Sequence, residues 1–215
     1  GDNLRASLIL TVIISAVLAI FFFFFCLLTG TEVIGVLEMI IISVISGTLA
    51  GIIVTVVGVL VSIVCYRKFW DLDMVGAPAV TTIGDIVTLP FLVVTALIVM
   101  DLPFTGKAVL GAVVFVMIAA AFISFKRGTR TMLDVLREGL PLLIPLSLLG
   151  ITAGVLYTSR LESLIAAAAV IILISPFMNG CGSIGGILTS RIGTEMHMGM
   201  IDPVLFPQKT VLKHF

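Results

Sequence analysis

The sequence predicts an all-α, polytopic membrane protein with about six transmembrane helices, because its composition, its long apolar runs and its charge distribution agree. Of its residues, 60% are apolar and 11% are charged, whereas soluble domains have roughly 45 to 50% and 25%. Apolar runs longer than about 18 residues recur along the chain, and each can cross a hydrocarbon layer of roughly 30 Å. A soluble fold of 215 residues could not bury so much apolar surface.

Six apolar runs are the predicted spans, and only short polar connections separate them. The runs cover residues 7–29, 34–66, 78–100, 107–125, 140–158 and 164–190. No connection between them is long enough to form a soluble domain. We therefore expect residues 1–215 to be a single transmembrane domain without a soluble regulatory domain, and an even number of spans places both termini on one side.

The distribution of basic residues tests the six-span prediction and orients it. Ten of the twelve Lys and Arg residues fall on one predicted side, namely Arg5, Arg67, Lys68, Lys126, Arg127, Arg130, Arg137, Arg191, Lys209 and Lys213. The remaining two, Lys107 and Arg160, fall on the other side. Because Lys and Arg gather in cytoplasmic loops, both termini are predicted to be cytoplasmic in a multi-pass protein of the cell membrane.

Net charge and cysteine spacing argue against two other classes of protein. The formal net charge is zero, and no basic block resembles a nucleic-acid-binding arm, so we expect no nucleic-acid partner. The three cysteines, Cys26, Cys65 and Cys181, are odd in number and show no CxxC spacing. This pattern favours neither a disulfide framework nor a zinc site.

Asp85 is an ionisable residue deep within a predicted span. A carboxylate in hydrocarbon costs roughly 2.5 to 3.5 kcal/mol on insertion scales, so such a residue is a functional candidate. Thr81, Asp85 and Thr88 are spaced as i, i+4 and i+7 on one helix face, with Gly84 beside them. We expect this face to line water, with Asp85 binding a divalent cation and both hydroxyls contacting its water shell. The alternative is a neutral or hydrogen-bonded carboxyl that only joins helices.

Two further carboxylates, Asp71 and Asp73, precede this span. They could concentrate cations at a cytoplasmic pore mouth. An equally good interpretation is a solvated loop with a helix-start signal ahead of Pro78.

The last predicted span is rich in small and polar residues. These are Pro176, Asn179, Gly180, Gly182, Ser183, Gly185, Gly186, Thr189 and Ser190. Small residues let another helix approach closely, which is the simplest interpretation of the glycines. Asn179 adds an amide whose carbonyl can coordinate a hard cation directly or through water.

Two segments carry a resemblance to a known family. They are DLDMVGAPAVTTIGDIVT, from Asp71 to Thr88, and PFMNGCGSIGGILTSRIGT, from Pro176 to Thr194. Together with the preceding LPLLIPLSLLGITAGVLY, they resemble the MgtE superfamily of magnesium channels. Within it they are most similar to the eukaryotic solute-carrier magnesium transporters and their prokaryotic half-size relatives.

This resemblance implies that Mg²⁺ is the transported ion and that Asp85 is the principal pore ligand. It also implies that the glycine-rich helix lines the pore, with Gly180, Gly182 and Ser183 in it. The first three spans are similar to helices three to five of a family repeat, the fourth to a connector, and the last two to helices one and two. The chain is thus a permuted unit or part of a longer protein, and a homodimer or pseudo-two-fold partner would supply both sets.

Two other functions are compatible with parts of the sequence. Ile83-Gly84-Asp85 is similar to the GxGD signature of intramembrane aspartyl proteases, but Thr82 stands where glycine is needed, and that chemistry requires a second aspartate. A membrane scaffold would have no need for Asp85. We therefore expect a divalent cation transporter or channel, not an enzyme, with a pore formed by the third and sixth spans; coupling to sodium or protons, and the direction of transport, stay open.

Overall fold

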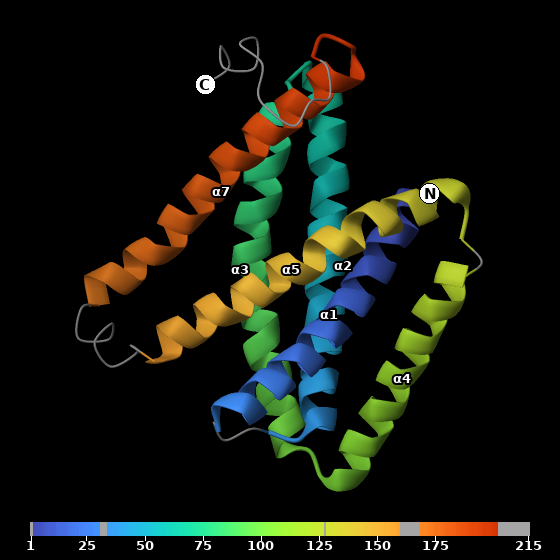
Figure 1. Ribbon diagram of the computed structural model, residues 1–215, viewed down its shortest axis with the longest axis vertical. Coiled ribbons are helices and arrows are strands. Elements are labelled where there is room, and N and C mark those ends of the chain that lie inside the picture. The colour runs from blue at the N-terminus through green and yellow to red at the C-terminus, as the bar shows by residue number, and fades with distance from the viewer. Residues whose placement is uncertain (1, 31–33, 127, 160–167, 202–215) are drawn as a thin grey trace. The chain divides into compact units, whose positions relative to one another are not determined.

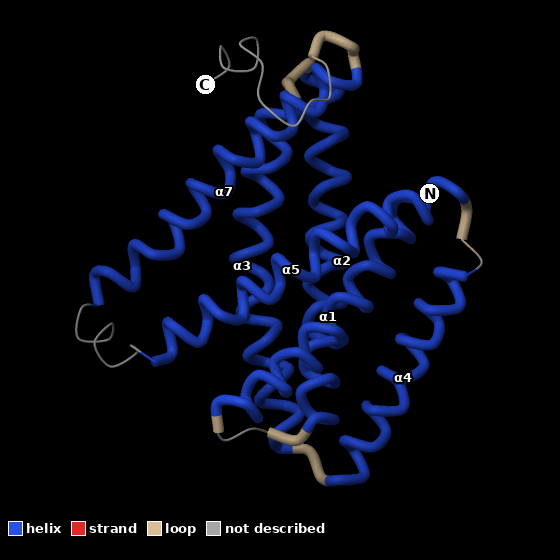
Figure 2. Tube along the Cα trace, viewed as in Figure 1, coloured by secondary structure: helices blue, strands red, loops and turns tan. Residues whose placement is uncertain are grey.

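The computed structural model describes residues 2–30, 34–126, 128–159 and 168–201, and every regular element in these ranges is an α-helix (Figures 1 and 2). The helices are α1 (Asp2–Thr29), α2 (Val36–Lys68), α3 (Leu72–Asp101), α4 (Phe104–Lys126), α5 (Arg130–Ser159) and α7 (Ala168–His197). The prediction of an all-α fold is confirmed.

Helices α1 to α5 are each long and apolar enough to cross a membrane, judged over the described parts of the chain. This confirms the polytopic membrane class. Helix α7 is a sixth long helix of 30 residues. Residues 164–167, which were predicted to belong to the last span, lie outside the described residues, so the span over 164–190 stays a prediction.

Several helices extend further than the apolar runs that predicted them. Helix α3 begins at Leu72 rather than at residue 78, α5 begins at Arg130 rather than at 140, and α7 continues to His197 rather than 190. An apolar run marks only the part of a helix that suits hydrocarbon, whereas the helix continues into polar residues until a cap or turn ends it. As a result Asp85 lies near the middle of α3, about 20 Å from its first residue at 1.5 Å per residue.

The chain divides into two compact units, which are described separately. Residues 1–55 and 86–161 form the first unit, and residues 56–85 and 162–215 form the second. In the first unit α1 packs against α5 and α4. Its largest fully buried side chains are Ile41, Leu136, Val44, Val99 and Val114.

Small and hydroxyl side chains at four-residue spacing join α1 to α2. Helix α1 contributes Ser7, Thr11 and Ser15, and α2 contributes Ser43, Gly47, Gly51 and Thr55. The Ser43 hydroxyl donates to the Ser15 carbonyl oxygen at 2.7 Å, and a methyl group added at Gly51 would lie 2.9 Å from Cγ2 of Thr11. This pair of stripes allows close approach of two helices and was not predicted from the sequence.

An ion pair joins the first turns of α2 and α4. The Lys107 ammonium lies 2.5 Å from Oε1 of Glu38, and the two side chains are 19% and 21% exposed. Both residues fall at the same predicted end of the spans, opposite the termini. The pair therefore fixes two helices of the first unit at this end.

Candidate functional site

The predicted site residues come together where the first half of α3 runs beside α7, within the second unit (Figure 1). The two helices run antiparallel, because contacts on α3 advance along the chain while their partners on α7 recede. Asp73, Ala77, Thr81 and Asp85 are the α3 residues in these contacts. They recur every four residues and so lie on one helix face.

Asp73 accepts hydrogen bonds from two hydroxyl groups of α7. The Ser190 hydroxyl donates to Oδ1 at 2.6 Å, and the Thr194 hydroxyl donates to Oδ2 at 2.7 Å. Ser190 and Thr194 are one helical turn apart, so both face α3. This carboxylate therefore fastens the first turn of α3 to the last part of α7.

The closest approach of the two helices is at Gly186. A methyl group added at Gly186 would lie 2.9 Å from Cβ of Ala77, which is too close for carbon atoms of two side chains. The absence of a side chain here thus sets the separation of α3 and α7. For Gly186, the interpretation of the glycines as helix-packing residues is confirmed.

A set of hydroxyl groups lies between this contact and Asp85. The Thr81 hydroxyl donates to the Ala77 carbonyl oxygen at 2.8 Å and lies 3.2 Å from the hydroxyl of Ser183. Ser183 is buried, and its hydroxyl donates to Oδ1 of Asn179 at 3.2 Å. The Thr81 hydroxyl, which was predicted to contact a water shell, therefore lies within bonding distance of Ser183, which in turn bonds to Asn179.

Asn179 connects these hydroxyls to the carboxylate of Asp85. Its Nδ2 donates to Oδ2 of Asp85 at 2.9 Å, while its Oδ1 accepts from Ser183 and, at 3.3 Å, from the Thr82 hydroxyl. The amide carbonyl that was expected to face an ion thus faces two hydroxyls, and the amide nitrogen faces Asp85. This arrangement orients the carboxylate rather than adding a second oxygen beside it.

The surroundings of Asp85 contain little charge. Over the described ranges, no Lys or Arg lies within ion-pairing distance of Asp85, and no group of three or more His, Cys, Asp or Glu is arranged to hold a metal ion. The site is one exposed carboxylate with an amide and hydroxyl groups. Such a sparse set of oxygens suits Mg²⁺, which dehydrates reluctantly and keeps several waters when one or two carboxylates bind it.

The other predicted residues lie at the edges of this contact. Gly84, Gly180 and Gly182 have open space where a side chain would be. Thr88 is exposed, one turn beyond Asp85 on α3, and belongs to the first unit.

Asp71 forms the N-terminal cap of α3. Its Oδ1 accepts a hydrogen bond from the backbone N–H of Asp73 at 3.0 Å, which satisfies a donor that the first turn leaves free. The helix-start interpretation is confirmed for Asp71, although the helix starts at Leu72 and not at Pro78. A role of Asp71 and Asp73 at a pore mouth stays a prediction.

Sequence reasoning missed Thr82, Ala77, Ser190 and Thr194 as members of this contact. The signal was present on α3, because the four-residue spacing that relates Thr81 to Asp85 continues back to Ala77 and Asp73. On α7 the hydroxyl residues continue at the same spacing from Gly186 toward the C-terminus. The four-residue spacing on α3 or on α7 does not by itself say which helix that face contacts.

A protein-family model matches part of the chain. Residues 1–95 match MgtE, a family of divalent cation transporters. This part of the chain is MgtE-like. Comparison with curated proteins and with solved structures gave no match.

The MgtE-like segment covers α1, α2 and most of α3, and it includes Asp85. Asn179 and the rest of α7 lie beyond it. The match and the five long apolar helices support a multi-pass membrane protein that transports divalent cations. MgtE is a family of transporters and not of enzymes, so the aspartyl protease interpretation of Gly84-Asp85 finds no support here.

Proposed function

We propose that this protein carries Mg²⁺ across the cell membrane through a pore lined by α3 and α7, with Asp85 as the principal ligand. The observation that carries this proposal is the 2.9 Å hydrogen bond from Asn179 to Asp85, at the middle of an apolar helix. A carboxylate at such a position is expensive unless water or an ion reaches it. The match of the surrounding segment to divalent cation transporters supports the same function.

In this proposal the Asp85 carboxylate binds the charge of the ion, and the polar groups around it bind the water shell of the ion. Asn179 donates to Oδ2 of Asp85, so the other carboxylate oxygen faces the ion or a water bound to it. Outer groups that orient a ligand in this way commonly matter nearly as much as the ligand itself. Thr82 and Ser183 hold the amide, Thr81 lies beside Ser183, and all three offer hydroxyls to the retained waters. Thr88 extends the polar face by one turn.

Asp73 and Asp71 mark the cytoplasmic end of this path. Their charges attract cations to the beginning of α3. Gly180 and Gly182 leave the α7 backbone uncovered on the way to Asp85, which suits a partly hydrated ion that needs room for its waters. The same oxygen ligands suit Mn²⁺ and Co²⁺. Mg²⁺ is therefore the first of several divalent cations to test.

A second copy of this chain, or a pseudo-two-fold partner, completes the pore in this proposal. One α3 and one α7 present a single carboxylate, Asp85, near the middle of α3. A two-fold arrangement places a second set opposite, as in transporters built from repeats.

Flux into proteoliposomes that contain a fluorescent Mg²⁺ indicator tests the function. Asp85→Asn keeps the size of the side chain and its hydrogen bonding but removes the charge, so we expect uptake to fall at least tenfold. Ile184→Ala, on an exposed position of α7, is the matched control and should leave uptake unchanged. Wild-type uptake by Asp85→Asn would contradict the proposal and favour a carboxyl that only joins helices. Cleavage of a membrane peptide that depends on Asp85 would favour a protease instead.

A further inference from the structure

The connection between α2 and α3 exposes three aromatic side chains at neighbouring positions. Tyr66 is 86% exposed, Phe69 is 96% exposed and Trp70 is 52% exposed. All three lie in the second unit, from the last turn of α2 to the start of α3. Exposed apolar side chains in a cluster mark a surface that contacts a partner or a membrane. We call residues 66–70 the aromatic–basic turn, because two basic residues complete it.

The backbone of this connection is closed by hydrogen bonds. The Trp70 N–H donates to the Cys65 carbonyl oxygen at 2.9 Å. The next residue, Asp71, accepts the Asp73 N–H through Oδ1 at 3.0 Å and so caps α3. Only residues 69–71 separate the two helices. A short, bonded connection of this kind presents its side chains at a defined place between α2 and α3.

The position of the aromatic–basic turn along the chain places it at a membrane surface. One candidate span, Val36–Lys68, ends within the turn, and the next, Leu72–Asp101, begins directly after it. Trp and Tyr are enriched at this depth, because an apolar ring with a polar group suits the boundary between acyl chains and water. The distribution of Lys and Arg predicts that this is the cytoplasmic side.

The two basic residues of the turn have no carboxylate partner among the side chains that the structure describes. Lys68 holds its ammonium group 5.0 Å from the centre of the Trp70 ring. The nearest carboxylates in the sequence, Asp71 and Asp73, accept hydrogen bonds from the α3 backbone and from α7, respectively. The charges of Arg67 and Lys68 are therefore available to an anion at the membrane surface.

The aromatic–basic turn forms a pocket of about 530 Å³. Its lining residues are Cys65, Tyr66, Arg67, Phe69, Trp70 and Asp71. Aromatic side chains could instead bind a quaternary ammonium group through cation–π contacts. The Lys68 ammonium already lies over the Trp70 ring, so a second cation there would be repelled. The one carboxylate of the lining, Asp71, opposes an anion with a single charge, which the two basic side chains outweigh.

We propose that the aromatic–basic turn binds an anionic phospholipid at the membrane surface. Arg67 forms paired hydrogen bonds with the phosphate group, and Lys68 adds a second positive charge. Tyr66 and Trp70 contact the lipid where its head group meets its acyl chains. Basic residues next to the end of a transmembrane helix attract anionic lipids in this way. A free phosphate ion would leave the exposed rings without contact, so this surface fits the phosphate of a lipid.

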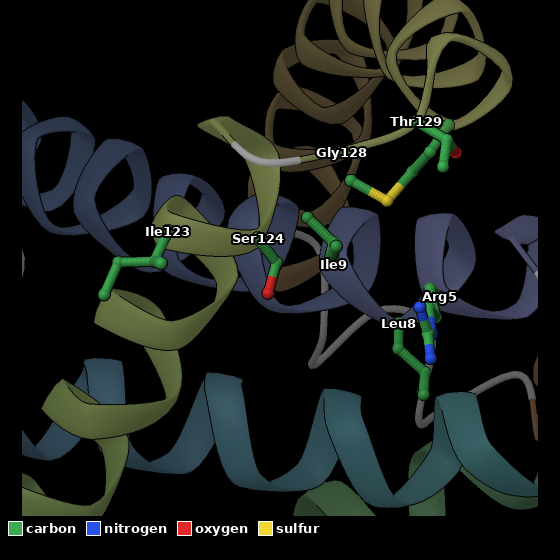
Figure 3. A pocket seen from close by; sticks show the side chains of 8 residues that line it. Arg5, Leu8, Ile9, Ile123, Ser124, Gly128 and Thr129 are labelled. Atoms are coloured by element: carbon green, nitrogen blue, oxygen red, sulfur yellow. The ribbon is translucent and has the colours of Figure 1, made fainter.

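Another pocket, of about 560 Å³ in the first unit, provides a comparison (Figure 3). Arg5 contributes a basic side chain to it, but none of the described residues that line it is aromatic. Arg5 is also exposed and falls on the predicted cytoplasmic side. A variant at Arg5 therefore tests whether any basic side chain on that side has the same effect as Arg67.

Fluorescence of Trp70 tests the proposal locally, because Trp70 is the only tryptophan of the chain. The full chain is reconstituted into vesicles of phosphatidylglycerol and phosphatidylcholine with the same acyl chains. One lipid at a time carries bromine on its acyl chains, and bromine quenches tryptophan fluorescence. We expect stronger quenching by brominated phosphatidylglycerol, equivalent to an affinity about fivefold above that of phosphatidylcholine. High ionic strength should reduce this preference, because salt screens surface charges.

Arg67→Gln should bring the quenching by the two lipids close to equal, and Arg67→Lys should keep most of the preference. Arg67 is exposed, and its replacement keeps the Lys68 ammonium over the Trp70 ring. Arg5→Gln is the matched control and should keep the wild-type preference. If Arg67→Gln does not fold, Lys68→Gln takes its place, with the two lipids compared within that variant.

Four outcomes would overturn the proposal. Equal quenching by the two lipids in the wild type would leave the rings as a membrane anchor without lipid preference. Stronger quenching by phosphatidylcholine would indicate a quaternary ammonium group between the rings. An unchanged preference in Arg67→Gln would exclude the guanidinium as the phosphate ligand. Loss of the preference in sodium phosphate, but not in sodium chloride of the same ionic strength, would indicate a site for free phosphate.

Discussion

Asn179 donates its amide nitrogen to the carboxylate of Asp85, and this 2.9 Å bond spans 94 positions of sequence to join α7 to the centre of α3. The same amide accepts hydrogen bonds from Ser183 and Thr82 through its oxygen. The orientation of the amide is therefore fixed by hydroxyls from both helices. A substitution at Asn179 therefore changes both the position of the Asp85 carboxylate and the hydrogen bonding of that carboxylate.

Asn179→Leu removes the donor while keeping a side chain of similar length. A hydrogen bond to a charged group contributes roughly 1.5 to 3 kcal/mol, so we expect the Mg²⁺ concentration for half-maximal uptake to rise about tenfold. Uptake in proteoliposomes over a range of Mg²⁺ concentrations measures this. Ile184→Ala serves again as the control on the same helix. An unchanged half-maximal concentration would mean that Asn179 does not position the ligand.

Gly186→Ala places a methyl group against Ala77, where the added Cβ would lie 2.9 Å from the Ala77 Cβ. Overpacking of this kind costs about 1 to 3 kcal/mol, so we expect a lower unfolding temperature in detergent and weaker Mg²⁺ uptake. Ala77→Gly combined with Gly186→Ala restores the space and should recover both.

Gly193→Ala is the matched control for this pair of changes. Gly193 lies on the same helix, and an added Cβ would meet no atom within 4 Å. Because alanine has the higher helix propensity, Gly193→Ala should not lose stability. A loss in Gly193→Ala equal to that in Gly186→Ala would mean that the Ala77 contact is not the source of the effect.

The sequence was sufficient to predict the helices and the unusual carboxylate. Long apolar runs have few alternatives to a transmembrane helix, and the cost of a charge in hydrocarbon singled out Asp85. The starts of α3 and α5 were not predicted, because polar residues such as Asp73 and Arg130 continue a helix without extending its apolar run. An apolar run therefore gives a minimum length.

Helix pairing was harder to predict, for a physical reason. The spacing of Asp73, Thr81 and Asp85 fixes which face of α3 is polar, but it does not say which helix that face contacts. Their partners on α7 lie about 100 positions away and were assigned to the pore only through family resemblance. The spacing of Ser7 and Thr11 on α1 and of Gly51 on α2 is also present in the sequence. Small residues at this spacing are common in membrane helices, so the pattern does not predict which helix is contacted.

Asp73→Ala removes both acceptors of the Ser190 and Thr194 hydroxyls. These groups are partly exposed, so water replaces some of the lost bonding, and we expect a loss of about 1 kcal/mol in stability. Thermal unfolding in detergent measures it. Asp71→Asn is the control, since asparagine also caps a helix, and its stability should match the wild type.

Asp71→Asn also tests whether this carboxylate has a role at the pore mouth besides capping α3. If the carboxylates gather cations, Asp71→Asn should slow Mg²⁺ uptake at low ionic strength and much less at high ionic strength, because salt screens exposed charges. Uptake that is insensitive to Asp71→Asn at every ionic strength would leave Asp71 with its capping role alone.

Phe69 ends α2 in a left-handed conformation that normally suits glycine. Its φ is 56°, and the Trp70 N–H bonds to the Cys65 carbonyl oxygen at 2.9 Å to close the turn. Helix α7 ends in the same way, with the Met200 N–H bonded to the Glu195 carbonyl oxygen at 2.9 Å, but there Gly199 takes the left-handed position, at φ 71°. The side chain of Phe69 is 96% exposed, so packing within the chain does not offset the backbone strain.

Phe69→Gly should therefore stabilise the protein. A left-handed residue other than glycine costs roughly 1 to 2 kcal/mol, part of which the greater freedom of glycine in the unfolded chain offsets. A net gain of about 1 kcal/mol would raise the unfolding temperature by about 2 to 4 °C for a chain of this size. Phe69→Ala removes the ring but keeps the strained backbone, so it should give no such gain. If Phe69→Ala stabilises as much as Phe69→Gly, the exposed ring and not the backbone is the source of the cost.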